Sequence, residues 1–162
     1  MQNILIPTNF SVQSLACVPA LCEQHKDSAL RLVFIHMFKI SDSISDLLML
    51  SRRNKEYSYI SDDFYAQCET LRQRYGQLII KIDFFYGSSL VNFRDFLEMN
   101  EIDVILDPSS CELGKLNRSS TDPMLFIGKS RIPFLSVVPQ QKIPVAGLKK
   151  EQLVLEEELM AG

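Results

Sequence analysis

The tripeptide Gly128-Lys129-Ser130 matches the end of a phosphate-binding P-loop and raises the question of a nucleotide site. A P-loop needs another glycine five positions earlier, a strand before the loop and a helix after it. Position 123 is proline, whose ring and missing N–H do not suit a backbone cradle for phosphate. An apolar run typical of a strand follows at 132–138, so the order of elements is reversed. We therefore interpret the tripeptide as the end of a helix that turns into a buried strand.

Cysteine and histidine spacing gives no sign of catalytic or metal chemistry. The two histidines, His25 and His36, lie in different predicted elements, and the cysteines form no Cys-x-x-Cys pair. The cysteines are Cys17, Cys22, Cys68 and Cys111. The sequence shows no serine or cysteine nucleophile with a nearby histidine and no paired carboxylates. We expect mostly buried, reduced thiols, no metal site and no enzyme activity.

Composition and charge exclude several function classes. The chain has 162 residues, 46% of them hydrophobic and 23% charged, which is typical of one globular domain. A net charge of −3 argues against nucleic acid as a partner. No apolar run approaches the roughly 18 residues of a membrane span, and the first residues lack the pattern of a signal peptide. We therefore expect a cytoplasmic protein without a membrane or nucleic-acid partner.

Apolar runs alternate with helical patterns along the chain. Predicted strands lie at 3–7, 30–37, 77–86, 102–106 and 133–138. Predicted helices lie at 12–24, 43–53, 62–75, 90–100 and 121–129. This alternation predicts a doubly wound α/β fold, in which helices cover both faces of a parallel sheet. Eight residues are expected in its core: Leu5, Val33, Ile35, Ile80, Val104, Ile105, Leu135 and Val137.

The order and content of these strands resemble the universal stress protein family. The stretch Asn3-Ile-Leu-Ile-Pro-Thr-Asn-Phe-Ser11 is similar to its opening strand and loop, and Leu32-Val-Phe-Ile-His-Met37 to its second strand. Gly87, the strand at 102–106 and the run at 132–139 fall where the family has similar features. The resemblance implies a five-stranded Rossmann-like sheet of order 3-2-1-4-5 in residues 1–139. Residues 140–162 would then form a C-terminal extension with a spacer and a short helix.

The family's ATP-binding members carry the motif Gly-x2-Gly-x9-Gly-(Ser/Thr) after the fourth strand. Counting back from the last strand places Asp107, Ser110, Ser120 and Thr121 at its positions; a one-residue shift of the first half gives Pro108 and Cys111 instead. Only Thr121 fits. Because glycines let backbone N–H groups approach phosphates, the loop is degenerate for ATP, and we expect no bound cofactor.

A polar crevice remains at the carboxyl ends of the predicted strands, where α/β sheets bind ligands. The resemblance implies that a remodelled pocket would use Thr8, Asn9, Met37, Ser110, Ser120 and Thr121. The same residue types also serve as helix caps and turn residues. The resemblance leaves open a small anion or an adenosine moiety between Asn9 and Met37.

Two functions follow from these observations. The first is a non-catalytic stress-response or regulatory protein that acts through dimerisation and protein contacts. The second is a nucleotide- or anion-binding sensor, or weak nucleotide hydrolase, with a remodelled pocket. The resemblance implies a homodimer through the edge strand Phe134-Leu-Ser-Val-Val138, which is apolar and uncharged. An apolar stripe at 148–160 is expected to form a helix that needs a surface to pack on.

Overall fold

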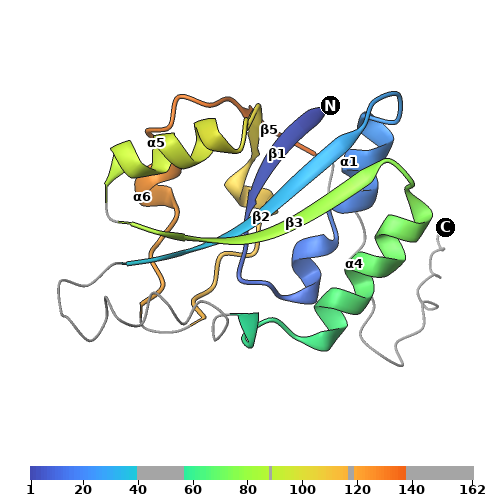
Figure 1. The fold of residues 1–162 in the computed structure, drawn as a ribbon, viewed down its shortest axis with the longest axis horizontal. Coiled ribbons are helices and arrows are strands. Elements are labelled where there is room, and N and C mark those ends of the chain that lie inside the picture. Colours follow the sequence, from blue (N-terminus) through green and yellow to red (C-terminus); the bar gives the residue numbers. More distant parts are fainter. Residues whose placement is uncertain (40–56, 88, 117–118, 138–162) are drawn as a thin grey trace, which may run out of the picture.

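The computed structural model of the chain describes residues 1–39, 57–87, 89–116 and 119–137 (Figure 1). Three predictions lie outside these residues: the helix at 43–53, the C-terminal extension at 140–162 and the last residue of the predicted fifth strand, at 138.

Five parallel strands form the central sheet. They are β1 (Gln2–Pro7), β2 (Leu30–Phe38), β3 (Leu78–Tyr86), β4 (Val104–Leu106) and β5 (Phe134–Leu135). Their order is β3-β2-β1-β4-β5, and every pair of neighbours is parallel. The predicted fold class and strand order are therefore confirmed.

The two strands on one side of β1 are shorter than predicted. β4 starts at Val104 rather than at 102, and β5 ends at Leu135. Glu101 and Arg131 precede these strands with positive φ angles of 55° and 67°. A residue with positive φ cannot continue an extended strand, so each chain segment turns before its strand begins.

The predicted helix at 12–24 is divided into η1 (Val12–Leu15), a 3₁₀ helix, and α1 (Val18–Gln24). Pro19 lies in the first turn of α1, where its missing N–H costs no helical hydrogen bond. In a continuous helix its ring would clash with the carbonyl group of Leu15, four residues earlier. The proline therefore explains why one predicted helix is two.

Two long helices agree with the prediction within two residues, whereas the last one does not. α4 (Asp62–Arg74) and α5 (Leu90–Met99) begin after Ser61 and Ser89, whose side chains accept hydrogen bonds from backbone N–H groups in the first turn. α6 covers only Met124–Ile127 instead of 121–129. Residues 119–121 instead lie antiparallel to the end of β2, where Ser120 pairs with Phe38 and the Thr121 N–H donates to the Met37 carbonyl oxygen.

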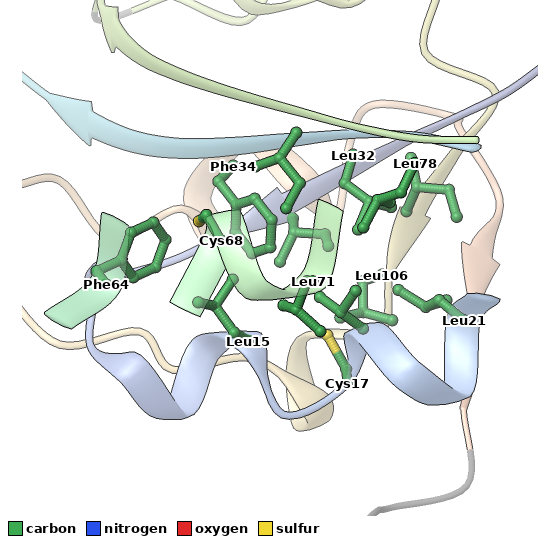
Figure 2. Close-up of a cluster of buried hydrophobic side chains, with 14 of the residues drawn as sticks. Leu15, Cys17, Leu21, Leu32, Phe34, Phe64, Cys68, Leu71, Leu78 and Leu106 are labelled. Atoms are coloured by element: carbon green, nitrogen blue, oxygen red, sulfur yellow. The ribbon is translucent and has the colours of Figure 1, made fainter. Parts of the chain in front are cut away.

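Helices cover both faces of the sheet (Figure 1). α1 and α4 pack on one face, and α5 and α6 pack on the other. Figure 2 shows side chains of η1, α1 and α4, among them Leu15, Leu21 and Phe64, gathered below the sheet.

Five of the eight predicted core residues are buried: Leu5, Val33, Ile35, Ile80 and Ile105. The expectation for Val104, Leu135 and Val137 is wrong, since they are only half-buried. Leu135 lies in β5, the edge strand, which has a neighbour on one side only, and Val137 lies beyond the end of this strand.

The aromatic core predicts a strong dependence of stability on Phe64. This fully buried side chain meets the rings of Phe10 and Phe34 edge-on, with centroids 5.6 and 6.0 Å apart. Phe64→Ala should reduce the free energy of unfolding by about 3–5 kcal/mol. Tyr65→Ala, on the 40% exposed neighbour in the same helix, is the control and should cost less than about 1 kcal/mol. Urea unfolding measures both; equal losses would contradict this picture of the core.

Candidate functional site

A pocket of about 280 Å³ lies at the carboxyl end of β2. One wall is the segment 119–121, which runs antiparallel to the end of β2. The Lys39 N–H donates to the Ser119 carbonyl oxygen, and the Thr121 N–H donates to the Met37 carbonyl oxygen, each over 2.8 Å. The lining residues are Thr8, Ile35, His36, Met37, Leu113, Gly114, Lys115, Ser120, Thr121, Asp122 and Pro123.

Four of the six candidate residues from the sequence meet at this pocket: Thr8, Met37, Ser120 and Thr121. Ser110 is not among the lining residues. It ends the short 3₁₀ helix η3 (Pro108–Ser110), where its N–H donates to the Asp107 carbonyl oxygen.

Asn9, the remaining candidate, holds the loop after β4 instead of lining the pocket. Its N–H donates to the Glu112 carbonyl oxygen over 2.7 Å, and its Oδ1 accepts the N–H of Ser11 over 2.9 Å. A Cβ atom on Gly114 would lie 3.0 Å from Asn9 Nδ2. The missing side chain of this glycine therefore lets the loop lie directly on Asn9.

His36 is the main site residue that the sequence analysis did not identify. Its Nδ1 lies 2.7 Å from the Thr8 carbonyl oxygen, and its Nε2 lies 2.7 Å from Ser120 Oγ. Because a carbonyl oxygen only accepts, Nδ1 carries the proton and Nε2 accepts from the Ser120 hydroxyl. Ser120 Oγ in turn accepts the N–H of Leu116 over 2.9 Å. The position of His36 near the carboxyl end of a predicted strand was the signal available in the sequence.

The environment of His36 favours the neutral ring. The side chain is 5% exposed, and its ring lies 4.9 Å from that of Phe38 and 6.4 Å from that of Phe10. Burial lowers the pKa of His36 below its usual value, against a smaller opposing effect of the Thr8 carbonyl. The imidazole is therefore neutral near neutral pH.

The Ser120–His36 pair has the donor pattern of a nucleophile and its general base. Ser120 is nevertheless only 5% exposed, and its oxygen already accepts a hydrogen bond from Leu116. An attacking oxygen must reach the substrate, so we interpret the pair as a structural tie between β2 and the pocket wall.

The two threonines of the pocket have opposite hydrogen-bonding states. Thr8 Oγ1 accepts the N–H of Phe10 over 2.8 Å and donates to Ser14 Oγ. Phe10 has a φ of 60°, and its N–H bond to Thr8 supports this uncommon conformation. Thr121 Oγ1 is buried and has no hydrogen-bond partner in the described part of the chain. Thr121 therefore offers the pocket an unused hydroxyl group.

Four backbone N–H groups in and after the loop that follows β4 are already bonded within the protein. The N–H groups of Ser110, Cys111, Leu116 and Thr121 all donate to other protein groups. Asp107 lies outside the pocket lining, and bonds from the amide and hydroxyl of Ser109 hold the pKa of its carboxyl group below the usual value. These four N–H groups are therefore not available to a phosphate chain.

The described residues also bear on metal binding, membrane spanning and thiol ionisation. Within 1–39, 57–87, 89–116 and 119–137, no group of three or more His, Cys, Asp or Glu residues could hold a metal ion. Among the helices that the structure describes, none is both long and apolar enough to span a membrane. Burial raises the pKa of the Cys17 thiol to about 12 and those of Cys22 and Cys68 to about 11, so these thiols stay protonated.

Comparison with known proteins gives a likeness of fold. No family model and no curated protein matches the sequence. Among solved structures, universal stress protein UspA from Lactobacillus plantarum is 15% identical, with a TM-score of 0.49 over 85% of this chain and 97% of that one. A universal stress family protein from Burkholderia pseudomallei is 15% identical, with a TM-score of 0.48 over 85% and 96%.

A universal stress family protein from Arabidopsis thaliana, solved with AMP bound, is 13% identical, with a TM-score of 0.44 over 87% of this chain and 94% of that one. These structures come from the family that the sequence motifs resemble. At such low sequence identity, the likeness to these structures assigns no ligand or activity to this chain.

The contrast between the threonines predicts opposite effects of one substitution. Thr8→Val leaves the N–H of Phe10 without its acceptor and removes the hydrogen bond to Ser14 Oγ, so it should cost about 1–3 kcal/mol of stability. Thr121→Val removes a buried hydroxyl that has no partner, so the free energy of unfolding should stay within about 0.5 kcal/mol or increase. Thermal and urea unfolding compare the two variants. A loss at Thr121 as large as that at Thr8 would show that its hydroxyl has a partner in solution.

Proposed function

We propose that this chain is a non-catalytic regulatory protein of the universal stress type. It binds a small ligand in the pocket at the end of β2 and acts through contacts with a second copy of itself. The observation that carries the proposal is the Thr121 hydroxyl, buried without a partner in the pocket wall. An unpaired buried hydroxyl is costly, and a ligand that accepts or donates a hydrogen bond there would remove this cost.

The walls of the pocket favour a small ligand with one flat or apolar part. Ile35, Met37 and Leu113 supply apolar surface, whereas Lys115 and Asp122 are exposed at its rim. A volume of about 280 Å³ is at the small end for ligand sites. Together with the sequence resemblance, these properties make a nucleoside or nucleoside monophosphate a better candidate than ATP.

Calorimetric titration with adenosine, AMP and ATP tests the ligand. Adenosine or AMP should bind and raise the melting temperature, because a ligand that binds only the folded state stabilises it. ATP should bind more weakly than about 10 μM, the affinity equivalent to about −7 kcal/mol. A tighter ATP complex would contradict the loss of the phosphate cradle.

Thr121→Val is the variant for this test, because its folding should be unaffected. Loss of one hydrogen bond should weaken binding about two- to tenfold. Thr70→Val is the matched control, since Thr70 lies exposed on α4 and its hydroxyl donates to the Ala66 carbonyl oxygen. Equal affinity in wild type and Thr121→Val would place the ligand elsewhere.

The contacts with a second copy are proposed to use β5. The Pro133 and Leu135 carbonyl groups accept hydrogen bonds from Ile105 and Asp107 of β4. Because backbone groups alternate in direction along a strand, those of Phe134 and Ser136 point away from the sheet. The side chain of Phe134 is also 44% exposed. This edge can therefore pair with another strand.

The opposite edge, at β3, is less open to pairing. The Arg72 guanidinium group donates to the Ile80 carbonyl oxygen over 3.2 Å, and the Tyr57 hydroxyl donates to that of Ile82 over 3.5 Å. The Phe84 N–H donates to the carboxylate of Asp83 over 2.8 Å. Side chains thus occupy backbone groups that a second strand would need, which favours β5 as the site of association.

Ser136→Pro tests this dimer. The substitution removes a backbone N–H that points away from β4, so an inner hydrogen bond of the sheet is not lost. The variant should be monomeric at tens of micromolar in light scattering, whereas wild type and the control Ser136→Ala should be dimeric. A dimer that forms equally well with proline at this position would place the interface on another surface.

A further inference from the structure

We propose that His36 is a pH-dependent latch on the ligand pocket. The neutral imidazole holds the pocket wall formed by Leu116 and residues 119–121 against β1 and β2, and protonation of the ring releases this wall. The latch itself is independent of the ligand; only its effect on binding rests on the proposed function.

The latch is a continuous row of hydrogen bonds across three parts of the chain. It runs from the Leu116 N–H to Ser120 Oγ, from the Ser120 hydroxyl to His36 Nε2, and from His36 Nδ1–H to the Thr8 carbonyl oxygen. The three distances are 2.9, 2.7 and 2.7 Å. His36 is thus the single titratable side chain in a row that joins the end of β1 to the pocket wall.

Protonation reverses the direction of the middle bond. A doubly protonated ring donates from both nitrogens, so Nε2 can no longer accept from the Ser120 hydroxyl. The added charge would also lie on a side chain that is 5% exposed. Charge burial without a counter-ion is unfavourable, and the released wall gives the ring access to water.

The described surroundings of His36 supply no counter-ion for this charge. The loop after β1 contributes Thr8 and Phe10, and β2 itself contributes Phe38. Lys115 and Asp122, which share the pocket, are exposed at its rim. Farther out, the groups near Phe10 and its neighbours are uncharged: Phe64 and the buried, protonated thiol Cys68 of α4, Phe84 of β3, and Tyr57, which precedes α4.

Release of Ser120 should open the pocket rather than unfold the sheet. Ser120 lies between two backbone bonds that attach the wall to β2, from Lys39 to Ser119 and from Thr121 to Met37. Thr121, with its unused hydroxyl, is the next residue in the chain. Movement of Ser120 therefore carries the proposed ligand-binding hydroxyl with it.

The sign of the pH dependence follows from the two states of the wall. In the open state the ring should titrate near its usual value of about 6.5, whereas the closed state binds the proton less well. The open state therefore gains population as pH falls below about 6.5, by up to tenfold per pH unit. Above that pH the populations of the open and closed states should not depend on pH.

Hydrogen exchange of the full-length protein, read by NMR and corrected for the intrinsic rate, tests the latch. Between about pH 7 and pH 5, protection of the Leu116 and Thr121 amides should fall, by up to about 25-fold when only the open state binds the proton. Protection of Leu32, which lies in the middle of β2, should stay constant. The glutamine side chain in His36→Gln does not titrate. In this variant the protection of the Leu116 and Thr121 backbone amides should therefore not depend on pH.

His25→Gln is the matched control, because His25 is the only other histidine and its ring nitrogen contacts the Leu21 carbonyl oxygen at the end of α1. This variant should keep the full pH response of the wall. If His36→Gln folds poorly, ring ¹⁵N shifts of wild-type His36 must titrate together with the exchange of Leu116.

Three results would overturn the proposal. They are pH-independent exchange of the wall in wild type, loss of the response in His25→Gln, and covalent labelling of Ser120 by a fluorophosphonate at neutral pH. The last would show that Ser120 is a reactive nucleophile instead of part of a closed latch. Failure of adenosine or AMP to bind would contradict the proposed ligand but leave the exchange result unchanged, so the two ideas fail separately.

Discussion

The parallel pairing of β1 with β2 is the constraint on which the site depends. Its register joins Gln2 to Leu30 and continues to Pro7 and Ile35. The next residues, Thr8 and His36, therefore lie side by side where β1 ends, and the Thr8 carbonyl meets the imidazole. The wall at 119–121 then attaches to the far end of β2. A change of register by one residue would turn His36 to the other face of the sheet and remove the tie.

The pocket and the β5 edge each present polar groups without a partner among the described residues. Most backbone groups of the sheet are paired within it, and at β3 the side chains of Arg72 and Tyr57 occupy outward carbonyl groups. In contrast, Thr121 Oγ1 has no described partner, and the backbone of Phe134 points outward. In the proposed function these groups are the ones used for binding, because bonds formed with them replace no internal ones.

Much of the fold could be predicted, because the apolar strands and the helices between them are local patterns. The sheet order needed the family resemblance, and the limits of elements needed particular contacts. Pro19 divides one predicted helix, and residues 119–121 pair with the end of β2 instead of starting another. Half-burial of Leu135 and Val137 depends on their place in the edge strand and just beyond it, which an apolar run does not reveal.

The sequence alone determined the loss of the glycine motif and the alternation of strands and helices, since both depend on residue type and near-neighbour spacing. Tertiary structure decided which polar residues form the site. Asn9 is a ligand candidate by its position, yet its backbone N–H donates to Glu112 and its side-chain Oδ1 accepts the N–H of Ser11. His36 and Ser120 are 84 positions apart and meet only because the chain returns across the end of β2. Contacts between such distant residues follow from the packing of the whole chain, and no local pattern encodes them.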